Sequence, residues 1–450
     1  MRASWVLVLL VLGVLQVRGD GYFPFDRTWP KGLLLGIVLF HLGLIWLILN
    51  KLYHQWTHSS PLPSKKSRFS AQTIWLLPPI LTLIILAGQA WQAERFEAVG
   101  YRWEPGWLSG LALLAFFGQG VAWRAARAGK WVKALSWAWA GALTLKLYPL
   151  FAFPLTAKRS DMLPIIYEAG RAWLDGRPIY QYFMLDNGVS TQMVRLPGMI
   201  ALYLPAVYFG LDLRWVLLFF ESILFLSLAL AIGRLPKASQ TFASIVWLAL
   251  AYLPYWHLRH ELYEAPFWVV LLLSLYLLKT GRLGWAGGGL GFLAAMHQWA
   301  WVLAPFLGLY LLRREGLKRT LLVATGASAA GYGVLAFGVQ GNWEAWQHHI
   351  FGYYEQFLAQ GNPYLMALYL TALFGKLGLL GWLKPLQLIG VLGFGWAQLK
   401  RPARLEEALF FGGLALAWML AFNVVAWTYQ YLLVVFLLAL ALGLRAHNQD

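Results

Sequence analysis

Asp161 is the residue with the clearest capacity for acid–base chemistry, because it follows two cations directly after an apolar segment. Those cations are Lys158 and Arg159. A carboxylate flanked by cations keeps a low pKa and stays ionised, so it can accept a proton from a hydroxyl group bound against it. The cations can neutralise a phosphate group held nearby. Spacing alone equally allows a surface ion pair at a helix end.

Further candidate residues come from other parts of the chain, and the predicted topology brings them to the same membrane face. They are Glu168, Tyr180, His260, His297, His348, His349, Trp427 and Tyr429. Ionisable residues in or next to membrane segments are costly and point to function by default. The alternative is that they are ordinary solvated loop residues.

Metal binding has little support in the sequence. His257, His260 and Glu261 have the spacing of a shared helical face, but the full HExxH signature of a zinc site is absent. His348 and His349 are adjacent, so their side chains diverge on a helix. The chain has no cysteine, which excludes disulfides and thiolate chemistry. We therefore expect neither a metal nor a cofactor.

The elements that position these residues are long apolar segments. Hydrophobic residues make up 60% of the chain and charged residues 12%. Many segments reach the roughly 20 residues that cross a bilayer as a helix. The sequence thus predicts an all-α, polytopic transmembrane bundle of about 14 helices. The expected helices are 3–17, 32–50, 73–92, 105–125, 134–154, 214–233, 240–257, 264–280, 283–297, 299–312, 319–339, 378–398, 405–424 and 427–445.

The charges between these helices set the predicted topology. The formal net charge is +17, and Lys and Arg cluster in alternate loops, for example at 65–68, 313–319 and 400–404. Cytoplasmic loops carry such clusters, so we place both termini in the cytoplasm and the protein in the plasma (inner) membrane. We therefore attribute the excess of basic over acidic residues to the membrane topology, and it does not indicate binding to nucleic acid. Within the 214–233 helix, Glu221 is expected to face the bundle interior, as an ion-pair partner or lining a cavity.

Two long loops, 155–197 and 340–365, fall on the outer side in this topology. Loops of this length in a compact membrane protein are usually functional. Apolar residues at near-helical spacing in 161–175 predict an amphipathic helix along the outer interface. The apolar block 196–211 contains two prolines and is interpreted as a re-entrant or tilted half-helix.

Residues 159–180 resemble the first outer loop of GT-C membrane glycosyltransferases. The nearest resemblance is to the polyprenyl-phosphate-mannose-dependent mannosyltransferases of glycosyltransferase family eighty-seven. That family has an Asp, then Tyr and small residues on an amphipathic helix, then Gly-x-x-Tyr. The corresponding residues here are Asp161, Tyr167, Ala169, Gly176, Pro178 and Tyr180. Where the family continues with Tyr-Pro-Pro, this chain has Arg195-Leu196-Pro197-Gly198.

Two later segments share the resemblance. Residues 279–314 resemble the family's short helical hairpin, with His297 where the family commonly has Lys. Residues 423–433 resemble the element before the family's last helix and keep its Trp as Trp427. We therefore expect residues 131–450 to form a GT-C-like catalytic module and residues 1–130 to be additional N-terminal transmembrane helices.

The resemblance implies an inverting glycosyltransferase that acts on the periplasmic or extracellular side. It would move mannose, or a related hexose or pentose, from a polyprenyl-phosphate donor to a hydroxyl of a lipid or glycan acceptor. Asp161 would be the general base. Lys158, Arg159 and His297, with His348 or His349, would hold the donor phosphate, and the remaining candidates would contact substrate. We expect a monomer.

A transporter or flippase of a lipid-linked or anionic solute is the alternative. Such a protein would also have many helices and interior charges. It would show two related halves with interrupted helices and a site at mid-membrane, and the sequence has no such repeat. A membrane scaffold without enzymatic activity would not explain two polar, aromatic-rich outer loops.

Overall fold

The computed structural model describes residues 74–96, 104–158, 160–235, 237–252, 264–352, 374, 377–423 and 431–447. Over these residues the chain is all-α except for one two-stranded hairpin, in agreement with the predicted fold class. The predicted helices 3–17 and 32–50 lie outside the described residues.

The chain divides into two compact units. Unit 1 comprises Met1–Lys65, Trp299–Leu321 and Ile350–Asp450, and unit 2 comprises Lys66–Gln298 and Leu322–His349. Unit 2 contains α4 (Leu77–Phe96), α5 (Pro105–Arg127), α6 (Trp131–Ala152), α7 (Met162–Leu174), α8 (Pro197–Tyr208), α9 (Arg214–Gly233), α10 (Lys237–Tyr252), α12 (Glu264–Lys279), α13 (Leu283–Met296) and α16 (Trp343–Gln347), with strands β1 (Tyr182–Met184) and β2 (Ser190–Gln192). Helix α15 (Leu317–Val339) begins in unit 1 and continues in unit 2.

Three described helices, α5, α9 and α15, are long and apolar enough to cross a membrane. Helix α9 has the predicted bounds, and α5 ends two residues beyond the predicted end. Helix α8 has 12 residues, or about 18 Å at 1.5 Å per residue, which is shorter than the hydrocarbon core. This length agrees with the half-helix predicted for 196–211.

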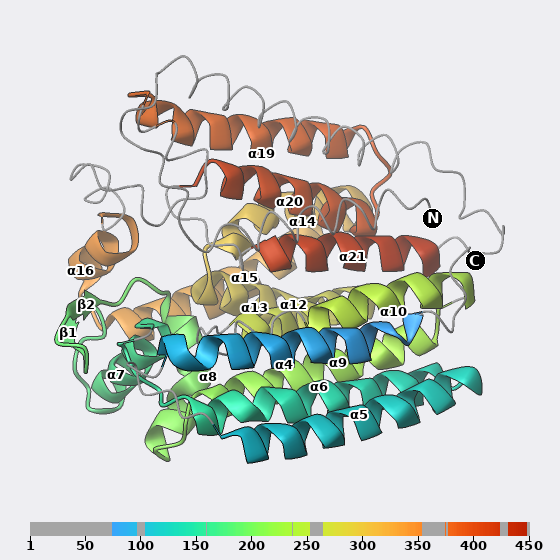
Figure 1. The fold of residues 1–450 in the computed structure, drawn as a ribbon. Helices are drawn as coiled ribbons and strands as arrows, with labels where there is room; N and C mark the ends of the chain where they lie inside the picture. The colour runs from blue at the N-terminus through green and yellow to red at the C-terminus, as the bar shows by residue number, and fades with distance from the viewer. Residues whose placement is uncertain are drawn as a thin grey trace. The chain divides into compact units, whose positions relative to one another are not determined.

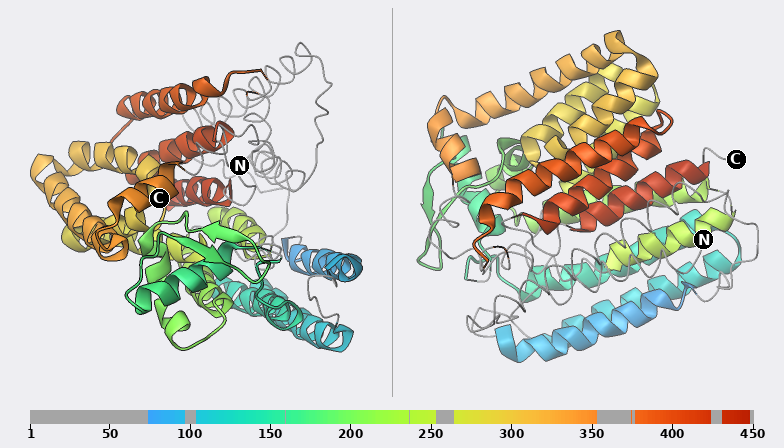
Figure 2. Two further views of the ribbon diagram at one scale, coloured as in Figure 1. Left: turned by 90° about the vertical axis from the view of Figure 1, so that its left-hand side faces the viewer. Right: turned by 90° about the horizontal axis from the view of Figure 1, so that it is seen from above.

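Helices α4, α5, α6, α9 and α10 run roughly along one direction in unit 2 (Figures 1 and 2). Helices α5 and α6 approach closely because Gly118 and Gly141 face each other's backbone: a Cβ at Gly141 would lie 3.0 Å from the Ala115 carbonyl oxygen. Small residues allow such backbone approach between apolar helices. These two helices lie on either side of the predicted boundary at residue 130.

Buried polar contacts tie the same helices together. The Gln119 amide donates to Thr82 Oγ1 at 2.6 Å and to the Tyr252 hydroxyl at 3.1 Å. Lys146 on α6 and Glu221 on α9 form an ion pair at 3.0 Å, with side chains 1% and 13% exposed. The Lys146 ammonium also lies 5.5 Å from the Trp139 ring centroid. The structure therefore places Glu221 in the bundle interior as an ion-pair partner, one of its two predicted roles.

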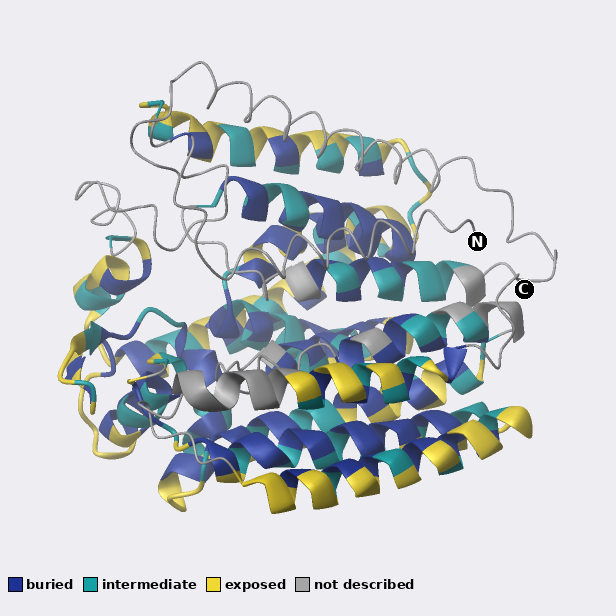
Figure 3. Cartoon of the chain, viewed as in Figure 1, coloured by how far each residue is buried: buried dark blue, intermediate teal, exposed yellow. Residues whose placement is uncertain are grey.

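Burial differs sharply between neighbouring helices (Figure 3). Helix α6 is largely buried, whereas α5 presents Leu113 and Phe117 with 71% and 65% of their surface exposed. A continuous apolar face of this kind is unusual on a soluble protein and typical of a surface that meets lipid or a partner.

Unit 1 contains α14 (Trp299–Glu315), η4 (Leu380–Trp382), α19 (Leu383–Leu399), α20 (Leu405–Ala421) and α21 (Tyr431–His447). Side chains bond to main-chain carbonyls of neighbouring helices inside it: Gln398 donates to the Phe306 carbonyl at 2.9 Å, and Arg313 donates to the Gln398 carbonyl at 3.2 Å. Helix α20 begins with two buried carboxylates, and Arg401 lies 3.8 Å from the second of them, Glu407.

Candidate functional site

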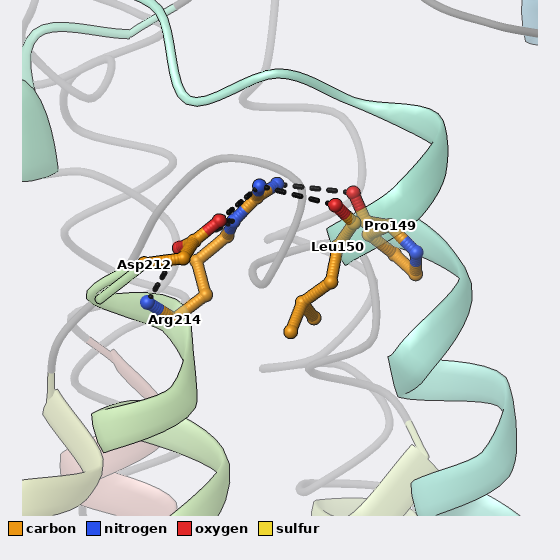
Figure 4. A network of polar contacts seen from close by, with 4 residues as sticks. All are labelled: Pro149, Leu150, Asp212 and Arg214. Atoms are coloured by element: carbon orange, nitrogen blue, oxygen red, sulfur yellow. Dashed lines mark hydrogen bonds and ion pairs between the residues drawn. The ribbon is translucent and has the colours of Figure 1, made fainter. Parts of the chain in front are cut away.

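The segment that carries Asp161 leaves α6 at a point fixed by Arg214. The Arg214 guanidinium donates to the carbonyls of Pro149 at 3.0 Å and Leu150 at 3.5 Å, and pairs with Asp212 (Figure 4). The last carbonyls of a helix have few intrahelical partners; the Pro149 carbonyl also accepts from the Phe153 amide at 3.0 Å, and the buried guanidinium, 1% exposed, adds a second donor. The end of α6 is thereby tied to the start of α9.

The next turn, residues 156–158, is held by Asp186. The Asp186 carboxylate accepts from the Thr156 hydroxyl at 2.5 Å and from the Ala157 amide at 2.7 Å. The side-chain amide of Asn187 donates to the Ala157 carbonyl at 3.1 Å. These contacts between residues about thirty positions apart fix the backbone that presents Lys158, whose side chain is exposed.

Asp161 lies at the N-cap of α7, where its side chain is exposed and makes no capping hydrogen bond. Helix α7 spans Met162–Leu174 and buries Ile165, Ile166 and Trp173, so the predicted amphipathic helix is confirmed. It packs on α8 through Gly170, where an added Cβ would meet Val207 at 2.9 Å. Glu168, on the same helix, is half-buried.

The two polar loops contact each other in unit 2. The buried His349 ring lies 5.8 Å from the Tyr180 ring, centroid to centroid, and its Nδ1 is 3.1 Å from the Met193 carbonyl. Because a carbonyl only accepts, Nδ1 carries the proton. The pKa of His349 is lowered, chiefly by burial, and the hydrogen bond to Met193 opposes that shift. His348 is exposed, and its ring contacts that of His349 at 5.8 Å.

His297 caps the carboxyl end of α13 and is 4% exposed. Its ring lies 5.9 Å from that of Phe267. Burial lowers the pKa of His297 well below its ordinary value, and the charge of Arg195 lowers it further. The imidazole is therefore neutral at pH 7, with a cation close by. At Gly198 the chain passes so near α13 that an added Cβ would meet the Ala295 carbonyl oxygen at 2.7 Å.

Residues 193–198, which we call the linking segment, connect these contacts. Tyr180 donates to the Arg195 carbonyl at 3.0 Å, and burial raises the pKa of Tyr180 so that the phenol stays protonated. His349 donates to Met193, Gly198 lies against the end of α13 just before His297, and the charge of Arg195 acts on the His297 ring. A guanidinium can bind an anion such as a phosphate by charge, and a neutral imidazole in the same region can add a hydrogen bond.

Apart from the half-buried Glu168 and the exposed His348, the predicted site residues fall into three groups. Tyr180, His297 and His349 meet at the linking segment, whereas Lys158 and Asp161 are exposed on the turn that leads into α7. The candidates Arg159, His260, Trp427 and Tyr429, and with them the histidine–glutamate triad around 257–261, lie outside the described residues. The strand pair and α7 lie at the end of the unit 2 helices where α6 finishes (Figure 1).

Sequence reasoning missed the β1–β2 hairpin and the role of Asp186. Strand β1 pairs antiparallel with β2, with Phe183 opposite Thr191. The signal was available, since Asp186-Asn187-Gly188 is a strong hairpin-turn sequence between β-prone runs, and Gly188 adopts φ +74°.

Comparisons with protein-family models, with curated proteins and with solved structures find no match to this chain.

Proposed function

We propose that this chain is a multi-pass membrane glycosyltransferase. It transfers a sugar from a polyprenyl-phosphate donor to a hydroxyl of a lipid or glycan acceptor, on the outer face of the plasma (inner) membrane. One observation carries the proposal: the linking segment gathers Arg195, His297, Tyr180 and His349 at the end of unit 2 that also presents Asp161.

A lipid-linked donor requires a site at the membrane boundary. The three long apolar helices and the exposed apolar face of α5 support a membrane location. Helix α6 belongs to this bundle, and the turn that carries Lys158 and Asp161 follows directly after it. The phosphate of a donor embedded in the membrane would lie at this level, at the edge of the hydrocarbon region.

In the proposed reaction, Asp161 accepts the proton of the acceptor hydroxyl. The oxygen attacks the anomeric carbon of the donor, and the bond between that carbon and the phosphate oxygen breaks with inversion. The bonding electrons leave with the polyprenyl phosphate, whose charge the cations stabilise. Lys158 and Arg195 serve this purpose, and His297 contributes as a neutral hydrogen-bond donor.

The experiment that tests the proposal uses membranes with and without the full chain, incubated with radiolabelled polyprenyl-phosphate sugars. Thin-layer separation should show label moving into a new product only when the chain is present. A parallel measurement in sealed vesicles follows the side on which the intact donor resides. Movement of intact donor across the vesicle membrane, without a new product, would instead favour a flippase.

A further inference from the structure

A hollow of about 560 Å³ lies at the other end of the unit 2 helices, where α6 begins. Its lining residues are Gly129, Lys130, Trp131, Val132, Lys133, Gly233 and Gln240. Helix α6 runs from Trp131 here to Ala152, which precedes the loop with Asp161. The hollow is therefore separate from the proposed transfer site by the length of a 22-residue helix.

Two features of the hollow favour an anion. Helix α6 begins without a side-chain cap, so the amides of its first turn remain available to an outside acceptor and the positive end of the helix dipole faces the same place. Lys130 and Lys133 line the hollow and are exposed. Gly233 lets α9 end directly against this turn, because a Cβ there would lie 2.3 Å from Val132 Cγ2.

A third feature favours a ligand that carries a hydrogen-bond donor. Gln240 is 8% exposed and lines the hollow. Its Nε2 donates to the Gly233 carbonyl at 3.2 Å, which fixes the orientation of the amide. Its Oε1 is buried and has no hydrogen-bond partner among the residues that the structure describes. A buried acceptor without a partner is costly, and a ligand hydroxyl would satisfy it.

We propose that the hollow binds the headgroup of an anionic membrane phospholipid that carries a hydroxyl, as in phosphatidylglycerol. The phosphodiester lies against Lys130, Lys133 and the first turn of α6, and the headgroup hydroxyl donates to Gln240 Oε1. The ends of α5 and α9, both of membrane-spanning length, place the hollow at the level of lipid headgroups. Trp131, whose ring lies 6.1 Å from that of Trp75, suits the same interfacial layer.

The test uses the purified full chain in a neutral detergent, titrated calorimetrically with short-chain phosphatidylglycerol, phosphatidic acid or phosphatidylcholine, and with inorganic phosphate. We expect phosphatidylglycerol to bind most tightly. Lys130→Ala/Lys133→Ala should weaken its binding by about fivefold for each lysine. The control is Arg314→Ala/Lys318→Ala, which removes the same charge from exposed positions elsewhere and should leave binding unchanged.

Gln240→Leu separates the hydroxyl contact from the charge. It should weaken phosphatidylglycerol and leave phosphatidic acid, which lacks the headgroup hydroxyl, unaffected. Equal losses in the two charge-removing variants would overturn the proposal, because binding would then follow net charge. Inorganic phosphate binding with the same dependence on Lys130 and Lys133 and the same affinity would overturn the lipid assignment. An unchanged preference for phosphatidylglycerol in Gln240→Leu would overturn the hydroxyl contact. None of these readouts depends on sugar transfer.

Discussion

At the scale of single residues, the decisive substitution is Asp161→Asn. It keeps the size of the side chain but removes the basic carboxylate, and general base catalysis contributes about 10²–10⁴-fold. We expect sugar transfer to fall by at least 100-fold, roughly, on that basis. Protein level and donor binding should persist, since Asp161 is exposed and does not cap α7. The measurement is the initial rate of transfer in membranes.

Glu168→Gln is the matched control, because it makes the same change on the same helix. Its effect on transfer should be milder. Near-normal transfer by Asp161→Asn together with an inactive Glu168→Gln would reassign the base to Glu168 and discredit the resemblance of this loop.

Removal of one phosphate-binding cation should raise the donor KM. Arg195→Ala removes the cation whose charge lowers the pKa of His297, and Lys158→Ala removes the one on the turn before α7. A charge-assisted hydrogen bond contributes about 1.5–3 kcal/mol, so each change should raise KM by roughly tenfold or more. Arg177→Ala, which breaks an exposed pair with Asp175, is the control. An unchanged KM in both Arg195→Ala and Lys158→Ala would refute the phosphate site.

The two buried histidines make stability depend on pH. The pKa values of His297 and His349 are lower in the folded protein than their ordinary value of 6.5. Below that value the unfolded chain binds protons that the folded chain does not, so stability falls as pH decreases through about 6.5. The melting temperature in detergent should drop from about pH 7.5 to about pH 5.5.

His297→Gln should reduce this pH dependence, because it removes one of the titrating groups. His348→Gln, at an exposed position, serves as the control and should retain the dependence. A His297→Gln protein whose melting temperature still falls with pH as steeply as the parent's would contradict the assignment.

At the scale of elements, the Lys146–Glu221 pair links α6 to α9. Removing one member of a buried pair leaves an uncompensated charge, at a cost of about 3–5 kcal/mol, whereas replacing both with apolar residues is often neutral. Lys146→Met should therefore destabilise the protein strongly, and Lys146→Met/Glu221→Met should recover most of the loss. Reversible unfolding in mixed micelles measures both. Glu221→Met alone completes the cycle, and a double variant whose loss of stability equals the sum of the two single losses would show that the pair has no coupling.

Most of the helices that the structure describes were predictable from the sequence, and most of the site contacts were not. Apolar periodicity and length gave α9 its bounds and identified α7 as amphipathic, because both signals are local. The approach of Gly198 to α13 and the contact of His349 with Met193 depend on packing between segments far apart in the sequence. Local hydrophobicity carries no information on such pairs. The role of Asp186 likewise depends on its contacts with Thr156 and Ala157, about thirty positions earlier in the chain.

At the scale of the whole molecule, the topology is testable by cysteine labelling, since the native chain has no cysteine. Val189 is 54% exposed between β1 and β2, and Lys318 is exposed at the start of α15. A membrane-impermeant thiol reagent applied to intact cells should label Val189→Cys and spare Lys318→Cys, because the basic loop is expected to face the cytoplasm. The reverse pattern would invert the proposed topology.

The linking segment receives its hydrogen bonds from Tyr180 and His349 through main-chain oxygens, at Arg195 and Met193. Every amino acid supplies that oxygen, so substitutions at position 193 retain the acceptor. At positions 180 and 349 the donor is a side-chain group, so a substitution that removes the Tyr180 hydroxyl or the His349 imidazole loses the hydrogen bond. The side chains of the linking segment can therefore change while hydrogen bonds to its main chain keep its path the same. If the proposed transfer activity holds, mutagenesis aimed at its substrate preference should vary side chains in the linking segment and keep Tyr180 and His349.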